Sequence, residues 1–74
     1  MLDKLDREWI DISSEEYRAY FFPNADKAVV IDYPNYLHIS DSGGHRIISK
    51  DGISFYIPPT WIAIEWKGEP NFVL

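Results

Sequence analysis

The residues at 42–46 carry the chemistry that this 74-residue chain can most readily perform. Ser42, Gly43 and Gly44 are followed at once by His45 and Arg46. Glycine lets an anion approach backbone N–H groups, and a guanidinium can hold a phosphate through two hydrogen bonds. The segment lacks the Lys-Ser/Thr ending of a phosphate-binding loop, and no helix is expected after it. Anion binding is therefore one interpretation, and a hairpin turn with solvated Arg and His side chains is the other, which turn chemistry favours.

Metal binding and catalysis are two further chemistries to weigh. His38, Asp41 and His45 are ligand types, but they do not show a recurring ligand spacing, which favours two unrelated surface histidines. Ser42 and His45 form the only nucleophile-like pair, and residues three apart across a turn rarely align. A short β domain also offers little volume for a cleft. We therefore predict a protein that is not an enzyme, with no metal, no other cofactor and no small-molecule substrate.

The chain is rich in aromatic residues, with three Trp, five Tyr and four Phe. Tyr20, Tyr36, Tyr56 and Trp61 are candidates for an exposed set, on which nucleobases stack at ~1–3 kcal/mol each. The alternative places these rings in the core or in a subunit interface. We favour the alternative, because a cysteine-free domain of this size has a marginal core and commonly gains stability by oligomerisation.

The net charge of −5 limits the partners that the protein can bind. Residues 1–16 hold six acidic and two basic side chains, and residues 17–74 are nearly neutral. Because a basic footprint is the usual sign of nucleic-acid binding, any such binding must be local, through the sheet and its loops. No apolar run approaches the ~20 residues of a membrane span, and the first residues are too charged for a signal peptide. We expect a cytoplasmic protein without a membrane partner.

The N-terminal elements are the least certain part of the pattern. Leu2, Leu5 and Trp9 share one helical face, which favours a short helix at 2–7, while residues 8–12 suit either a helix or a strand. Ser13-x-x-Glu16 matches a capping box, but the aromatic run at 17–22 ends at a proline and favours a strand.

The run at 27–32 contains three adjacent β-branched residues, which favour a strand. Short runs at 36–40, 45–49, 53–57 and 61–66 follow, in which apolar and polar residues alternate. Gly43-Gly44 predicts a tight hairpin in which glycine takes a positive φ, and Asp51-Gly52 predicts the next turn. Pro58-Pro59 must end a strand, because proline cannot donate to the ladder. These runs predict an all-β, strongly bent small barrel of about five or six short strands, with the following buried residues: Val29, Ile31, Leu37, Ile39, Ile62 and Ile64. The chain is one domain, with an acidic segment at 1–16, the barrel at 17–66 and a tail at 67–74.

Longer motifs resemble known families. The segment at 56–61 resembles the Tyr-Ile-Pro-x-x-aromatic end of SH3-type barrels. The runs Ser42-Gly-Gly-His-Arg-Ile, Lys50-Asp-Gly-Ile-Ser-Phe-Tyr-Ile-Pro-Pro-x-Trp61 and Ile64-Glu-Trp, with Glu15-Glu-Tyr-Arg and Phe22-Pro before them, resemble a family of small cyanophage proteins abundant in ocean metagenomes. That family is similar in fold to Sm/LSm proteins. The resemblance covers about residues 15–66, and it implies a five-stranded barrel with an N-terminal helix, a homo-oligomeric ring and a nucleic-acid-binding role.

Our functional prediction is an Sm-like phage protein that binds RNA or single-stranded DNA as a homo-oligomer. Positive groups on the rim contact phosphates, glycines allow close approach, and aromatic rings stack on bases. His45 adds charge below its ~6.5 reference pKa. The predicted site comprises Arg46, His45, Lys50, Gly43, Gly44, Tyr36 and Tyr56.

Two alternatives remain open for that prediction. The protein can be a non-catalytic interaction or structural accessory module of a phage, such as an SH3-like domain that binds a proline-rich peptide. Arg46 can also have a purely structural role, in which it pairs with Asp41 or Asp51 and rigidifies the hairpin.

Overall fold

The computed structural model describes residues 8–68, and every regular element within them is a β-strand. The predicted all-β class is therefore confirmed, while the expected helix at 2–7 lies outside the described residues. The undecided segment at 8–12 contains a short strand, and the capping box at 13–16 does not start a helix. The strands are β1 (Ile10–Asp11), β2 (Tyr17–Phe21), β3 (Val29–Asp32), β4 (Pro34–Ile39), β5 (His45–Ser49), β6 (Ser54–Ile57) and β7 (Ala63–Lys67).

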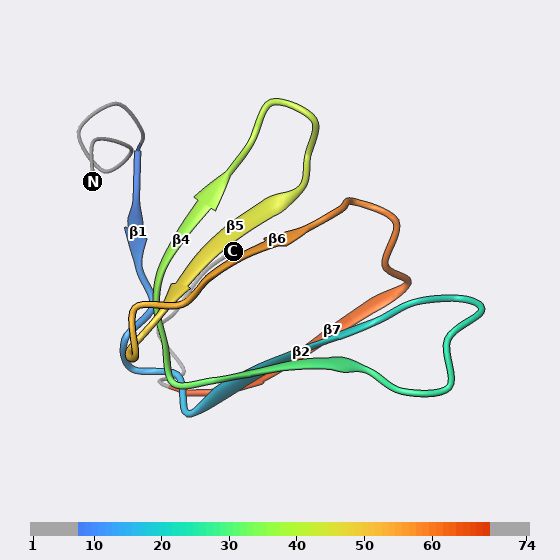
Figure 1. Cartoon of the computed structure of the whole chain (residues 1–74), viewed down its shortest axis with the longest axis horizontal. Coiled ribbons are helices and arrows are strands. Elements are labelled where there is room, and N and C mark those ends of the chain that lie inside the picture. Colours follow the sequence, from blue (N-terminus) through green and yellow to red (C-terminus); the bar gives the residue numbers. More distant parts are fainter. Residues whose placement is uncertain (1–7, 69–74) are drawn as a thin grey trace.

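The strands form two antiparallel, bent sheets, and no ladder within residues 8–68 joins the two sheets into a closed barrel (Figure 1). The first sheet has the order β1-β4-β5-β6, and the second has the order β3-β2-β7. Pro58 and Pro59 lack an N–H group, and they carry the chain from β6 to β7 without pairing these two strands. Each sheet therefore keeps two edges within residues 8–68, and no ladder closes the structure there.

Tyr33 stands between β3 of the second sheet and β4 of the first, so the chain passes from one sheet to the other at this residue. Its φ of 50° lies in the left-handed region, which is uncommon for a bulky side chain. Two backbone hydrogen bonds hold it there: its N–H donates to the Glu16 carbonyl at 2.8 Å, and its carbonyl accepts from the Lys50 N–H at 2.8 Å. Contacts with both neighbouring segments thus impose a conformation that local preference disfavours.

The two hairpins of the first sheet share one turn design. The Gly43 N–H donates to the Ser40 carbonyl at 2.8 Å, and the Gly52 N–H donates to the Ser49 carbonyl at 2.9 Å. Both glycines have positive φ, at 93° and 85°. The predicted hairpins are present, but the first is not a two-residue Gly-Gly turn. Gly44 lies beyond the turn and is needed for space, because a Cβ there would lie 2.8 Å from the Ile57 carbonyl oxygen.

The core lies between the sheets and consists of Ile12, Tyr20, Ile31, Leu37, Ile47 and Ile57. Burial of Ile31 and Leu37 is confirmed, and Ile64 packs partly buried against the cluster. Burial was wrongly predicted for Val29, Ile39 and Ile62, which are 37–69% exposed. These three lie at strand ends or just before a strand, where alternation continues but the opposite sheet no longer covers the side chain.

A buried polar network joins the two sheets inside this core. The Arg18 side chain, 0% exposed, donates to both carboxylate oxygens of Glu15, from Nε at 2.9 Å and from a terminal nitrogen at 2.7 Å. Its other terminal nitrogen donates to the Tyr20 hydroxyl at 3.2 Å, and that hydroxyl lies 2.6 Å from Nδ1 of His45. Since buried polar groups are costly without partners, this chain of bonds ties β2 of one sheet to β5 of the other.

Candidate nucleic-acid interface

The outer face of the first sheet brings several of the predicted site residues together. Side chains alternate along β5, so Arg46 and Ile48 face away from the core, which holds their neighbours. His38 of β4 and Tyr56 of β6 lie directly opposite Arg46 on either side. Tyr36 lies opposite Ile48. The face therefore presents a row of an imidazole, a guanidinium and a phenol ring beside a second, more apolar row.

Arg46 makes a cation–π contact in this row. Its guanidinium carbon lies 5.1 Å from the centroid of the Tyr56 ring, which is 46% exposed. Within residues 8–68, Arg46 forms no ion pair with Asp41 or Asp51, so the structural alternative in which these carboxylates hold it is not what the fold shows. The Tyr56 hydroxyl lies 2.9 Å from the Ser42 hydroxyl, which steadies the ring. The guanidinium thus keeps its donors available to an anion.

Trp9 adds an aromatic ring that the sequence did not assign to the site. It meets Tyr36 edge to face, with centroids 6.5 Å apart and planes at 75°, and it lies 5.8 Å from the ring of His38. His38 is itself held by its Nδ1–H, which donates to the Glu8 carbonyl at 2.9 Å. The sequence signal that could have placed Trp9 on this face is the alternation of apolar and polar residues at 8–12, which predicts a strand. The helical spacing of Leu2, Leu5 and Trp9 points to a helix instead.

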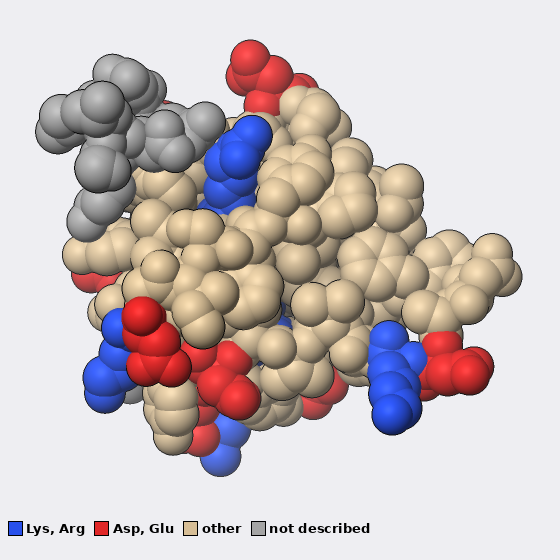
Figure 2. All heavy atoms as spheres, viewed as in Figure 1, with Lys and Arg blue, Asp and Glu red and all other residues tan. Residues whose placement is uncertain are grey.

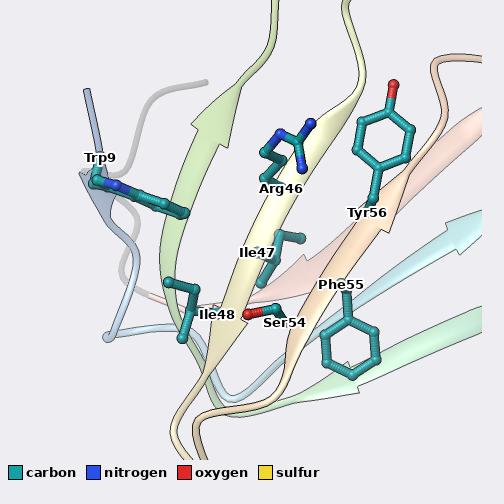
Figure 3. A pocket seen from close by; sticks show the side chains of 7 residues that line it. All are labelled: Trp9, Arg46, Ile47, Ile48, Ser54, Phe55 and Tyr56. Carbon is teal, nitrogen blue, oxygen red and sulfur yellow. The ribbon is translucent and has the colours of Figure 1, made fainter. Parts of the chain in front are cut away.

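Two hollows flank Arg46 on this face. One, of about 250 Å³, is lined by Trp9, Ile48, Ser54 and Phe55 together with Arg46 and Tyr56 (Figure 3). Figure 3 shows Arg46 between Trp9 on one side and Tyr56 on the other. The second hollow, of about 320 Å³, is more polar and is lined by His38, Ser40, Asp41, Ser42, Arg46 and Tyr56. Arg46 and Tyr56 therefore line both hollows, of which the second is the more polar.

The two glycines do not expose bare N–H groups to an incoming phosphate, as we had expected. The Gly43 N–H is used by the turn, and the Gly44 N–H donates to the Ser42 hydroxyl at 3.4 Å. Gly44 is also buried. Their role in the structure is to shape the turn and to make room for the Tyr56 ring.

His45 belongs to the core and not to the rim. It is 6% exposed, its ring lies 4.6 Å from that of Trp61, and it bonds to the buried Tyr20 hydroxyl. Burial, aided by the charge of Arg18, lowers the pKa of His45 to about 4, so its side chain stays neutral where we had expected it to gain charge. The Tyr20 hydroxyl consequently donates to a neutral imidazole. We do not retain His45 in the interface.

The remaining predicted residues are spread over the molecule. Lys50 lies at the other end of β5, with its ammonium 5.8 Å from the centroid of the Tyr33 ring. Tyr20 is in the core, and Trp61 packs against it at 5.2 Å. His38 and His45 lie on opposite faces of the first sheet, and residues 8–68 contain no group of three His, Asp or Glu side chains placed to hold a metal.

Charged side chains are scattered rather than concentrated. In Figure 2, Lys, Arg, Asp and Glu side chains lie mainly near the margins of a broad uncharged surface. Lys67 and Glu16 form an exposed pair at 3.7 Å. No helix within the described part of the chain is long and apolar enough to cross a membrane. Any attraction of the interface for a polyanion must come from individual cations such as Arg46.

Comparison with known proteins gives no family for this chain. No family model matches the sequence, and neither a curated protein nor a solved structure matches it significantly.

Proposed function

We propose that this protein binds single-stranded nucleic acid, RNA or single-stranded DNA, on the outer face of its first sheet and performs no catalysis. The observation that carries the proposal is the guanidinium of Arg46 over the Tyr56 ring, between two hollows and facing Trp9. A guanidinium can hold a phosphate through two hydrogen bonds while exposed rings stack on bases. Base stacking does not depend on net charge, so it suits an acidic chain.

Single strands suit this face better than a duplex does. Unstacked bases can enter hollows of a few hundred Å³ and stack on aromatic rings, whereas bases in a duplex are already stacked. Duplex binding without base contacts depends on many phosphate contacts, and the net charge of −5 argues against them.

The test is fluorescence anisotropy with labelled oligo-U and oligo-dT over a series of salt concentrations. Wild-type protein should bind more weakly as salt rises. Arg46→Ala should weaken binding and reduce the salt slope by about 0.7, the value for one phosphate contact on a single strand. Lys27→Ala is the matched control, because it removes an equal charge from the exposed loop between β2 and β3. The proposal would be overturned if the wild-type protein did not bind at low salt, or if Arg46→Ala and Lys27→Ala lost equal amounts of affinity.

We further propose that the strands are arranged as in Sm/LSm or SH3 proteins and that the protein is a homo-oligomer. We also propose that it acts in the cytoplasm, which is the host's cytoplasm if a phage encodes the protein. The two-sheet topology with the bend at Tyr33 supports the fold kinship. Among the strands of residues 8–68, β6 and β7 lie at sheet edges, and a neighbouring copy could pair with an edge of this kind. Light scattering at micromolar concentration that gives only the 8.7 kDa monomer would contradict the oligomer.

A protein-interaction module is the second candidate. Val30, Ile53 and Ile62 are each more than half exposed and lie outside the aromatic face. Exposed apolar side chains form a protein-docking surface where they are contiguous, so this candidate requires such side chains to share one patch. The two candidates differ in salt dependence, since docking of an apolar peptide does not weaken steeply as salt rises.

A further inference from the structure

The cation–aromatic pair of Arg46 and Tyr56 has a counterpart at the opposite end of β5. Lys50 directly follows β5, and its ammonium lies 5.8 Å from the centroid of the Tyr33 ring. The Tyr33 side chain is 57% exposed. Both ends of the strand therefore present a cation beside an accessible ring.

The two pairs mark the two ends of β5. Arg46 and Ile48 are two residues apart within β5, so the pleat places them on the same side of the sheet, and Lys50 follows the last residue of the strand, in the turn to β6. Between the two cations, Ile48 lies opposite Tyr36. β5 and the residue after it thus contribute three successive rungs: an arginine with a tyrosine, an isoleucine with a tyrosine and, just beyond the end of the strand, a lysine with a tyrosine.

The backbone at Tyr33 marks this end of the row as unusual. A bulky residue at a φ of 50° is energetically unfavourable, and such conformations concentrate at functional positions. Glycine or asparagine would adopt this conformation more readily, yet an exposed tyrosine stands there. The core gains little from the ring, because more than half of it is exposed.

The spacing of the cations matches several nucleotides. Lys50 stands four positions after Arg46, a span of up to ~13 Å at ~3.3 Å per residue of extended chain. A stacked single strand has one charge per ~3.4 Å, so this span corresponds to about four stacked intervals, and to fewer in an extended strand.

We infer that the bound single strand runs along β5, with one phosphate on Arg46, another on Lys50, and bases stacked on Tyr56 and Tyr33. This inference rests on the proposed function and adds the path and the length of the bound segment. The middle rung of Ile48 and Tyr36 provides apolar surface for an intervening base.

The test is a length series of oligo-dT from two to ten nucleotides, measured by anisotropy competition at one low salt concentration. Affinity should rise until both cations are engaged, at about three to five nucleotides, and then level off apart from a statistical increase. Tyr33→Gly keeps the left-handed backbone while removing the ring. Tyr33→Gly should lower the affinity for the ten-nucleotide oligomer about fivefold or more, because the loss of one base stack costs ~1 kcal/mol. Its affinity for the two-nucleotide oligomer should equal that of the wild type.

Three further variants separate the inference from the proposed function. Lys50→Ala should remove the gain with length as Tyr33→Gly does, Tyr33→Phe should retain the gain, and Lys27→Ala should resemble wild type. If Arg46→Ala weakens binding but Tyr33→Gly and Lys50→Ala do not, the path along β5 is wrong and the proposed function stands. If no oligonucleotide binds, the proposed function fails and the inference fails with it.

Discussion

The hydroxyl of Tyr20 allows a sharp test of the buried network. Tyr20→Phe removes one oxygen and keeps the ring that packs against Trp61. The change removes the bond that the hydroxyl accepts from a terminal nitrogen of Arg18 at 3.2 Å and the bond that it donates to Nδ1 of His45 at 2.6 Å. Each unsatisfied buried group costs ~1–3 kcal/mol. Because Arg18 keeps its two bonds to Glu15, we expect a loss of ~2–4 kcal/mol in the free energy of unfolding.

Urea denaturation measures this loss, with the slope m used to check that the transition stays two-state. Domains have ~0.05–0.15 kcal/mol of stability per residue, so this chain has on the order of 4–11 kcal/mol and the loss is a large part of it. Tyr17→Phe is the matched control, because the Tyr17 hydroxyl donates to Glu65 at 2.8 Å in an exposed pair, and we expect its removal to cost less than ~1 kcal/mol. Equal destabilisation by both variants would refute the idea that the network holds the sheets together.

Three other predictions test the core and the turn. Burial lowers the pKa of His45 to about 4, so between pH ~6.5 and about 4 the imidazole takes up a proton in the unfolded chain but not in the folded one. The free energy of unfolding should therefore fall as the pH drops from ~6.5 towards about 4. In His45→Phe, the denaturation midpoint should change less with pH over that interval. Gly44→Ala would place a Cβ 2.7 Å from Cζ of Tyr56, so we expect a loss of ~1–3 kcal/mol and weaker oligonucleotide binding; an unchanged melting temperature would contradict the geometry. Ile47→Ala should cost ~2–5 kcal/mol because the side chain is fully buried, whereas Ile62→Ala should cost less than ~0.5 kcal/mol, and calorimetry that reversed this order would show that the core is misplaced.

Local patterns in the sequence were enough to find the strands and the turns. Alternation at 36–40 and 45–49 predicted β4 and β5 and the inward direction of Leu37, because a strand's period depends only on neighbouring residues. Asp51-Gly52 likewise predicted a turn that has positive φ at the glycine. Strands and turns of this kind can be predicted without knowing which segments pack on the other side of the core.

Features that depend on distant segments could not be predicted in this way. The sequence does not reveal that Arg18 and His45, which are 27 residues apart, meet through Tyr20, so His45 was assigned to the rim. The outer-face position of Arg46 was predictable from the pleat, but its contact with Tyr56 depends on the register of β5 with β6. The left-handed Tyr33 has no local signal, since long-range hydrogen bonds hold it.

The order in which the sheets can assemble follows from their connections. β4, β5 and β6 are joined by short turns, so their contacts bring together residues close in sequence. β2 and β7 pair Tyr17 with Lys67, which requires closure of a loop of about fifty residues. Because long loops lose more entropy on closure, we expect the three-strand meander to form early and the β2–β7 ladder to form late. Pulsed hydrogen exchange should then protect Ile47 amides before those of Ala19, and a nascent chain that lacks β7 would still present the aromatic face.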